Sequence, residues 1–123
     1  MIEYKFNEID ETLYITVSGT FGINHMFKEI DSFANDNSLP RKLKILEDAR
    51  NLSVTFTEDE IQLLIERLKS HLFKFDSIRH ALVHLDPVNT AFAMLVSERL
   101  SGNNYLLKVF SDEEYALHWL QLA

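Results

Sequence analysis

The sequence predicts an α/β fold with five strands and four helices in the order ββαβαβαβα. Three observations predict it. The first segments of the chain alternate apolar and polar residues, which is typical of a β-hairpin. Later apolar segments of strand length are separated by longer segments with helical spacing. Short links join them, so we expect the later strands to be parallel, with right-handed crossovers.

The N-terminal third of the chain predicts a hairpin followed by a helix. Residues 2–6 and 12–18 each place apolar side chains at every second position, as expected of half-buried strands. Gly19 is expected to end the second strand. Apolar side chains then recur every three or four residues across 23–34, which predicts an amphipathic helix.

The centre of the sequence predicts a strand followed by a capped helix. Residues 43–48 are short and apolar and end in two acids, which is typical of a parallel strand covered on both faces. After a loop, Thr57 and Glu60 form a capping box, in which each side chain bonds the other residue's backbone amide. The helix that they begin keeps its apolar spacing to Leu72.

The C-terminal third predicts two further strand–helix pairs. A strand at 78–85 leads into a helix at 88–100, and a strand at 106–110 leads into the final helix. Ser111 and Glu114 match a second capping box, so Ser111 is expected to begin that helix.

Composition and charge exclude several classes of protein. The 123 residues are 46% hydrophobic and 25% charged, which predicts one globular domain over residues 1–123. A net charge of −7 argues against nucleic acid or an anionic membrane as the partner. The chain has no cysteine, which excludes thiol catalysis and thiolate metal sites. No apolar run reaches the roughly 18 residues of a transmembrane helix, and the charged first residues do not resemble a signal peptide.

Acidic and histidine side chains occur at the predicted carboxyl ends of the strands, where open parallel sheets bind ligands. Asp48, His84 and Asp86 would make a metal-dependent enzyme only if they converged on one pocket. Cap and turn preferences already explain the acids. His80 lies about 13 Å along the strand from His84, and a lone strand histidine is more often a hydrogen-bonded, partly buried residue. We therefore expect no catalytic residue, metal or cofactor.

The run from Ala91 to Val96 is apolar around most of a helix. One interpretation is a helix packed against the sheet and a neighbouring helix. The other is an apolar contact surface formed by Phe92, Met94 and Val96, which would serve a homodimer, a partner or a lipid. Both interpretations stay open.

Four segments together resemble a known family. They are residues 13–19, residues 44–50, residues 79–83 and residues 109–120, the last with an Ala-x-x-Trp-Leu ending. In this order they resemble a STAS-like domain of the SpoIIAA-like branch, which is related to anti-sigma-factor antagonists and more distantly to Sec14-type lipid-binding domains. The resemblance implies a single (βα) superhelix whose mostly parallel, mixed five-stranded sheet has an antiparallel N-terminal edge strand.

The resemblance also implies where a partner would bind. Phospho-regulated antagonists carry a switch serine at the start of the helix after the third strand. Here that place reads Phe56-Thr57-Glu58-Asp59-Glu60, so the usual serine is missing, and phosphorylation of Thr57 or Ser53 stays an open question. The predicted partner-binding residues are Asp48, Arg50, Asn51, Ser53 and Thr57.

Three functions remain after these arguments. The first is a non-catalytic, bacterial and cytoplasmic interaction or regulatory module with a protein partner, a second copy of the chain included. The second is a carrier of a small apolar ligand or lipid, which predicts a sizeable apolar cavity. The third and least favoured is a metal-dependent enzyme that uses the acidic strand ends.

Overall fold

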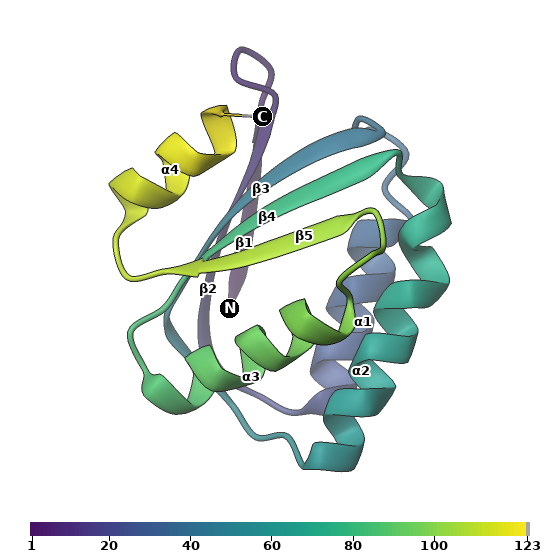
Figure 1. Cartoon of the computed structure of the whole chain (residues 1–123), viewed down its shortest axis with the longest axis vertical. Helices are drawn as coiled ribbons and strands as arrows, with labels where there is room; N and C mark the ends of the chain where they lie inside the picture. The colour runs from purple at the N-terminus through teal and green to yellow at the C-terminus, as the bar shows by residue number, and fades with distance from the viewer. Residues whose placement is uncertain (123) are drawn as a thin grey trace.

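Five strands form one sheet in which the spatial order follows the order along the chain, as Figure 1 shows for the computed structural model. The structure describes residues 1–122. The strands are β1 (Ile2–Asn7), β2 (Thr12–Phe21), β3 (Lys42–Val54), β4 (Ser77–Val83) and β5 (Tyr105–Phe110). β1 is antiparallel to β2, and the other three pairs are parallel. The predicted mixed sheet with an antiparallel N-terminal edge strand is confirmed.

Three helices cover one face of the sheet and a fourth covers the other (Figure 1). α1 (Ile23–Ala34), α2 (Glu58–His71) and α3 (Pro87–Arg99) share a core with the first face, and α4 (Glu113–Gln121) packs on the second. A 3₁₀ turn, Leu72–Lys74, follows α2. Because the strand order is sequential and the three connecting helices share a face, the chain winds as the predicted (βα) superhelix.

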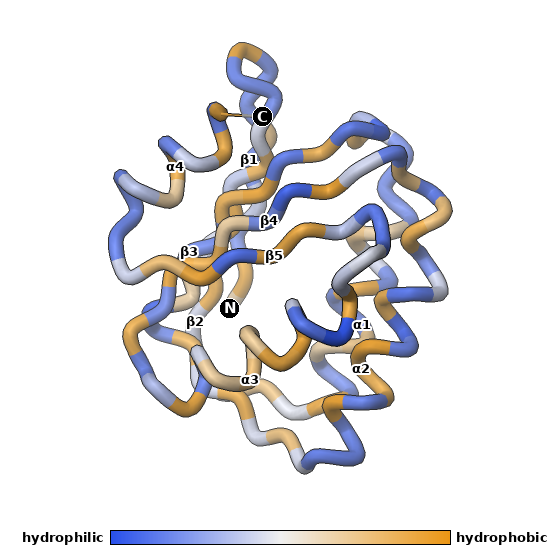
Figure 2. The backbone as a smooth tube through the Cα atoms, viewed as in Figure 1, coloured by the Kyte–Doolittle hydropathy of each residue, from blue (hydrophilic) through white to orange (hydrophobic). Residues whose placement is uncertain are grey.

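Alternation along the strands divides the apolar side chains between these two faces. Leu43 and Ile45 of β3 are buried on the three-helix face, whereas Leu46 is buried against α4. Ala81 of β4 and Ala116 of α4 are fully buried, because these small side chains let helix and sheet approach closely. Figure 2 shows that α3 is apolar along most of its length, as the run in the sequence predicted.

β2 and β3 extend further than predicted. β3 continues to Val54 instead of ending at Asp48, and β2 continues past Gly19. The register of this pair shifts between Thr16 and Ser18, which breaks the strict alternation from which the strand ends were predicted. Gly19 has a φ of +103°, a conformation that glycine adopts without a steric penalty, so the strand passes through it.

One of the two predicted capping boxes is confirmed. The amide of Glu60 donates to Thr57 Oγ1 at 3.2 Å, and the amide of Thr57 donates to Glu60 Oε1 at 2.8 Å. The prediction that Ser111 caps the last helix is wrong. Asp112 caps α4 instead, and its Oδ1 accepts two amides of the first turn at 2.7 and 3.3 Å. A carboxylate is favoured there because it also interacts with the positive end of the helix dipole.

The corrected cap predicts different effects for two neighbouring substitutions. Asp112→Ala removes the acceptor of two helix amides, so we expect the free energy of unfolding to fall by about 1 kcal/mol. Ser111→Ala should change it by no more than about 0.5 kcal/mol. Urea denaturation of both variants measures the difference, and equal losses would show that Ser111 shares the cap.

Candidate functional site

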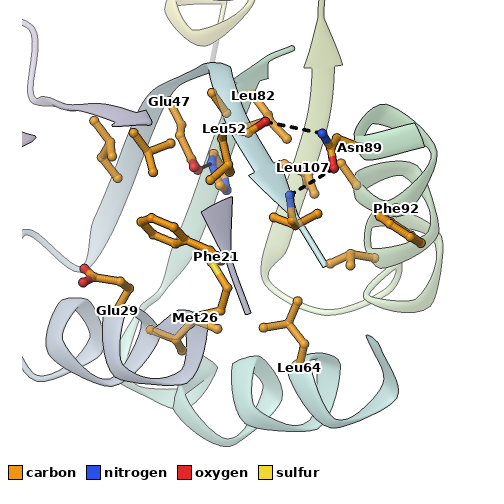
Figure 3. Close-up of a pocket in the computed structure, with 18 of the residues that line it drawn as sticks. Phe21, Met26, Glu29, Glu47, Leu52, Leu64, Leu82, Asn89, Phe92 and Leu107 are labelled. Atoms are coloured by element: carbon orange, nitrogen blue, oxygen red, sulfur yellow. Dashed lines mark hydrogen bonds and ion pairs between the residues drawn. The ribbon is translucent and has the colours of Figure 1, made fainter. Parts of the chain in front are cut away.

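A cavity of about 200 Å³ lies between the sheet and the three helices α1, α2 and α3. Figure 3 shows Met26 of α1 and Leu64 of α2 on one side of it, and Leu82 and Leu107 of the sheet on the other. Phe92 of α3 also lines it. The lining is overwhelmingly apolar, so the cavity is suited to an apolar molecule.

The helix pair above the cavity is held together by its own contacts. Asp31 of α1 accepts from Arg67 Nη1 of α2 at 2.5 Å and pairs with His71 Nε2 at 2.9 Å. Hydrogen bonds from His71 and Arg67 lower the pKa of Asp31. Phe33 of α1 stacks on Phe75 beyond α2. These contacts join α1 to α2, and Arg67 also lies over the ring of Phe27 at 4.4 Å.

A chain of three polar side chains crosses the sheet beneath the cavity. Glu47, His80 and Tyr105 come from the adjacent strands β3, β4 and β5, and all three line the cavity. His80 Nε2 lies 2.7 Å from Glu47 Oε1, and His80 Nδ1 is hydrogen-bonded to the hydroxyl of Tyr105. The sheet face under the helices therefore carries a row of three hydrogen-bonded polar side chains, of which Tyr105 is buried and the other two are partly buried.

The donors in this chain follow from the state of Tyr105. Burial, with a smaller contribution from the charge of Glu47, raises the pKa of Tyr105, so its hydroxyl stays protonated and donates to His80 Nδ1. His80 then carries its proton on Nε2 and donates to Glu47. A tyrosine with a raised pKa is a poor nucleophile, because it keeps its proton at neutral pH.

A second polar group lines the cavity where β3 ends. Asn89 of α3 donates to the carbonyl of Leu52 at 3.3 Å and accepts from the amide of Val54 at 3.4 Å (Figure 3). His84 bonds the same Leu52 carbonyl through Nε2 at 3.2 Å and accepts from the amide of Asp86 at 3.0 Å. These groups tie the extension of β3 to the start of α3.

A third polar pair lies at the β1 side of the cavity. The hydroxyl of Tyr4 donates to Glu29 Oε2 of α1 at 2.6 Å, and both residues line the cavity. Partial burial and this hydrogen bond raise the pKa of Tyr4. Tyr4 is 46% exposed, so this pair stands between the cavity and solvent.

Comparison with known proteins gives a match in structure. An uncharacterized protein of the DUF3478 family from Shewanella loihica PV-4, described as having a SpoIIAA-like fold, superposes with a TM-score of 0.63. The match covers 98% of this chain and 92% of that one at 15% identity. This chain has the SpoIIAA-like fold. No protein-family model and no curated protein sequence matches it.

Within this SpoIIAA-like fold, the five predicted partner-binding residues lie on the extension of β3 and the start of α2. Arg50 binds Asp48 through two nitrogens at 2.9 and 2.8 Å, which lowers the pKa of Asp48. Asn51 and Ser53 are exposed on the strand, and Thr57 is exposed at the helix cap. The segment was predicted to be a loop; a strand presents these side chains in a fixed arrangement instead.

The three residues predicted to form an apolar contact surface do not share one face of α3. Val96 is buried in the main core, and Phe92 is half-buried beside Phe56 at the cavity. Only Met94 is exposed, at 60%. The packed-helix interpretation therefore accounts for two of the three side chains.

The acidic strand ends of the SpoIIAA-like fold do not form one site. Asp48 is paired with Arg50. It lies beside Val83, a residue of the α4 face, whereas His84 lines the cavity on the opposite face. Asp86 is used as the cap of α3. Within residues 1–122 no group of three or more histidine or acidic side chains is placed to hold a metal ion.

Glu47 and Tyr105 are site residues that the sequence reasoning missed. Glu47 was grouped with Asp48 at the strand end, although alternation from Leu43 and Ile45 places it on the helix-covered face. The fifth strand predicted over 106–110 begins one residue too late and excludes Tyr105. A charged residue at an inward position of a buried strand was the signal for the cavity chain. In the described part of the chain, no helix combines the length and hydrophobicity that crossing a membrane requires.

The raised tyrosine pKa values predict a loss of stability at alkaline pH. An unfolded chain ionises its tyrosines near pH 10, whereas Tyr105 keeps its proton to higher pH in the fold. Its contribution to folding is therefore complete below about pH 10 and falls by about 1.4 kcal/mol for each pH unit above it. Tyr14 acts in the same direction, because burial and Asp10 raise its pKa to about 12.

In Tyr105→Phe, the free energy of unfolding should fall less steeply with pH, because one ionising group is lost. Urea denaturation between about pH 9 and pH 11 measures the difference. Tyr115→Phe is the matched control, because Tyr115 is 71% exposed. If both variants kept the slope of the parent protein, the ionisation of Tyr105 would not contribute to it.

Proposed function

We propose that this protein is a non-catalytic, STAS-like module that binds a small apolar ligand. The cavity under α1, α2 and α3 is the observation that carries the proposal. The sequence favours a protein-interaction module as the first hypothesis and a carrier of an apolar ligand as the second. The cavity favours the second, because an apolar cavity is the feature that separates the two.

The size of the cavity defines the size of the ligand. An engineered cavity of roughly 150 Å³ binds benzene, while most drug-sized ligands occupy about 300–1,000 Å³. At about 200 Å³, the cavity matches a single ring or a short alkyl chain. A lipid with two long chains exceeds it, so the lipid-carrier alternative narrows to small single-chain or single-ring molecules.

The energetic cost of the cavity also favours a binding role. Enclosed voids in protein cores cost about 24 cal/mol for each Å³, so about 5 kcal/mol is the upper limit for a space of this size, and the opening beside Tyr4 lowers the cost. The upper limit is comparable to the net stability of a typical domain. Filling the space with larger side chains would stabilise the fold, and an apolar ligand supplies the missing contacts only when it is present.

Two matched alanine substitutions test the cavity. Ala93 lines it from α3, whereas Ala91 is exposed on the same helix and does not. We expect ethylbenzene to shift the NMR resonances of cavity methyl groups in the parent protein and in Ala91→Phe. Ala93→Phe should abolish these shifts, because its ring occupies the space. Absence of saturable shifts in the parent protein would refute the ligand-binding proposal.

A protein partner is a second candidate, supported by the exposed end of β3. Arg50 bridges Asp48 and Glu113, at 2.8 and 3.7 Å, and lies in one strand with the exposed Asn51 and Ser53. We propose that this surface binds a protein in a bacterial cytoplasm, with a second copy of the chain as one form of partner. Thr57 already caps α2 and acids follow it, so the surface does not rely on a switch serine.

Arg50→Ala tests this surface, because it removes the side chain that holds the arrangement together. Lys69→Ala is the control, since it removes an exposed basic side chain at the other end of α2. A protein captured by the parent and by Lys69→Ala should be lost from Arg50→Ala in quantitative mass spectrometry. Identical captured sets for all three baits would remove this candidate.

A further inference from the structure

Most polar groups that line the cavity are already occupied by protein partners. Asn89 uses its oxygen for Val54 and its nitrogen for Leu52, and both ring nitrogens of His84 are bonded. Both ring nitrogens of His80 are bonded as well. None of these groups is left to select a ligand.

Glu47 and Glu29 each use only one of their two carboxylate oxygens. Of the two, Glu47 lies on the sheet beneath the cavity, whereas Glu29 is bonded to Tyr4 at the exposed side. Glu47 Oε1 accepts from His80 at 2.7 Å, and within residues 1–122 no protein group donates to Oε2. The Glu47 side chain is 17% exposed, and Oε2 is not among the fully buried unpaired atoms of the described chain. This oxygen is therefore accessible, and Glu47 is a residue of the cavity lining. A carboxylate oxygen in apolar surroundings is stabilised by a hydrogen-bond donor.

The charges around the cavity point in the same direction. Glu29 and Glu47 both line it, and the lining contains no lysine or arginine. Its bases are His80 and His84, and the hydrogen bonds of both are satisfied with a neutral ring. A ligand carboxylate would lose its hydration without gaining a cation to pair with, and it would meet two like charges.

We infer that the cavity selects a small apolar molecule whose head is a hydrogen-bond donor, a hydroxyl or an ammonium group, and that it rejects the corresponding carboxylate. The donor bonds Glu47 Oε2, and the ring or short chain lies among the apolar residues. The hydrogen bonds from Tyr105 through His80 hold the other oxygen of Glu47, so the acceptor is fixed before the ligand arrives. This inference rests on the proposed ligand-binding function.

Four ligands with related carbon skeletons test the selectivity: 2-phenylethanol, 2-phenylethylamine, phenylacetate and ethylbenzene. Calorimetric or NMR titration at neutral pH should find that the alcohol and the amine bind the parent protein at least tenfold more tightly than phenylacetate. A factor of ten corresponds to about 1.4 kcal/mol. Phenylacetate binding as tightly as the alcohol would overturn the inference.

Glu47→Gln identifies the residue responsible. Glutamine keeps an oxygen for His80 but replaces the free oxygen by an amide nitrogen, which donates hydrogen bonds. We expect the preference for the alcohol and the amine over phenylacetate to shrink at least fivefold. Glu114→Gln removes the same charge from the exposed side of α4 and should leave the preference unchanged. Equal preferences in the two variants would overturn the role of Glu47.

The two proposals fail in different ways. If no ligand binds the parent protein, ethylbenzene included, both the binding function and the selectivity are wrong. If ethylbenzene binds and the three polar ligands do not differ, only the selectivity is wrong. The order of the ligand affinities in the parent protein tests the selectivity even if Glu47→Gln does not fold.

Discussion

The parallel register from β2 to β5 is the constraint on which the rest of the structure depends. Ile45, His80 and Leu107 lie side by side across three strands, so every second residue of each strand faces the same helices. The same alternation brings Glu47 and Tyr105 within reach of His80. A one-residue slip of β4 would turn His80 toward α4 and leave the Glu47 carboxylate without its donor. The polar chain thus helps to specify the register that creates it.

The two faces of the sheet are packed in different ways, and this difference makes the cavity tolerable. On one face α4 lies close to the strands over Ala81 and Ala116, and Arg79 stacks on Trp119 at 4.0 Å. On the other face α1 and α2 are joined to each other through Asp31 and Arg67. These contacts hold α1 and α2 to each other, while Ile30 and Ile65 pack both helices against the sheet.

The sequence predicts most of the architecture, because its signals are local. Hydrophobic periodicity located all five strands and four helices, and the Thr57 capping box located the start of α2. The extension of β3 was missed because its inward residues Ala49 and Leu52 are three positions apart, which disguises the alternation. That irregularity accompanies a register shift against β2, and pairing between strands distant in sequence leaves no local signal.

The cavity could not be predicted from the sequence, because it depends on how completely side chains from distant elements pack against each other. Its lining consists mostly of the types that fill any core, and among the strand residues the inward positions of Glu47 and His80 distinguish it. In a core without a void, a carboxylate at this position would be costly. A cavity that admits a donor removes that cost for one oxygen, while His80 removes it for the other. The cavity therefore accounts for a carboxylate at the position of Glu47, and the carboxylate gives the cavity a polar group that can bind a donor.

α2 connects the cavity to the exposed end of β3. Its first turn carries the Thr57 cap next to the predicted partner-binding strand, and its inner side lines the cavity through Ile61 and Leu64. An occupant that contacts these two side chains acts on the same helix that borders the exposed surface. By linkage, a ligand at a hundred times its Kd adds about 2.7 kcal/mol to the stability of the state that binds it. In the two proposals, the ligand and the protein partner therefore contact the same structural element, α2.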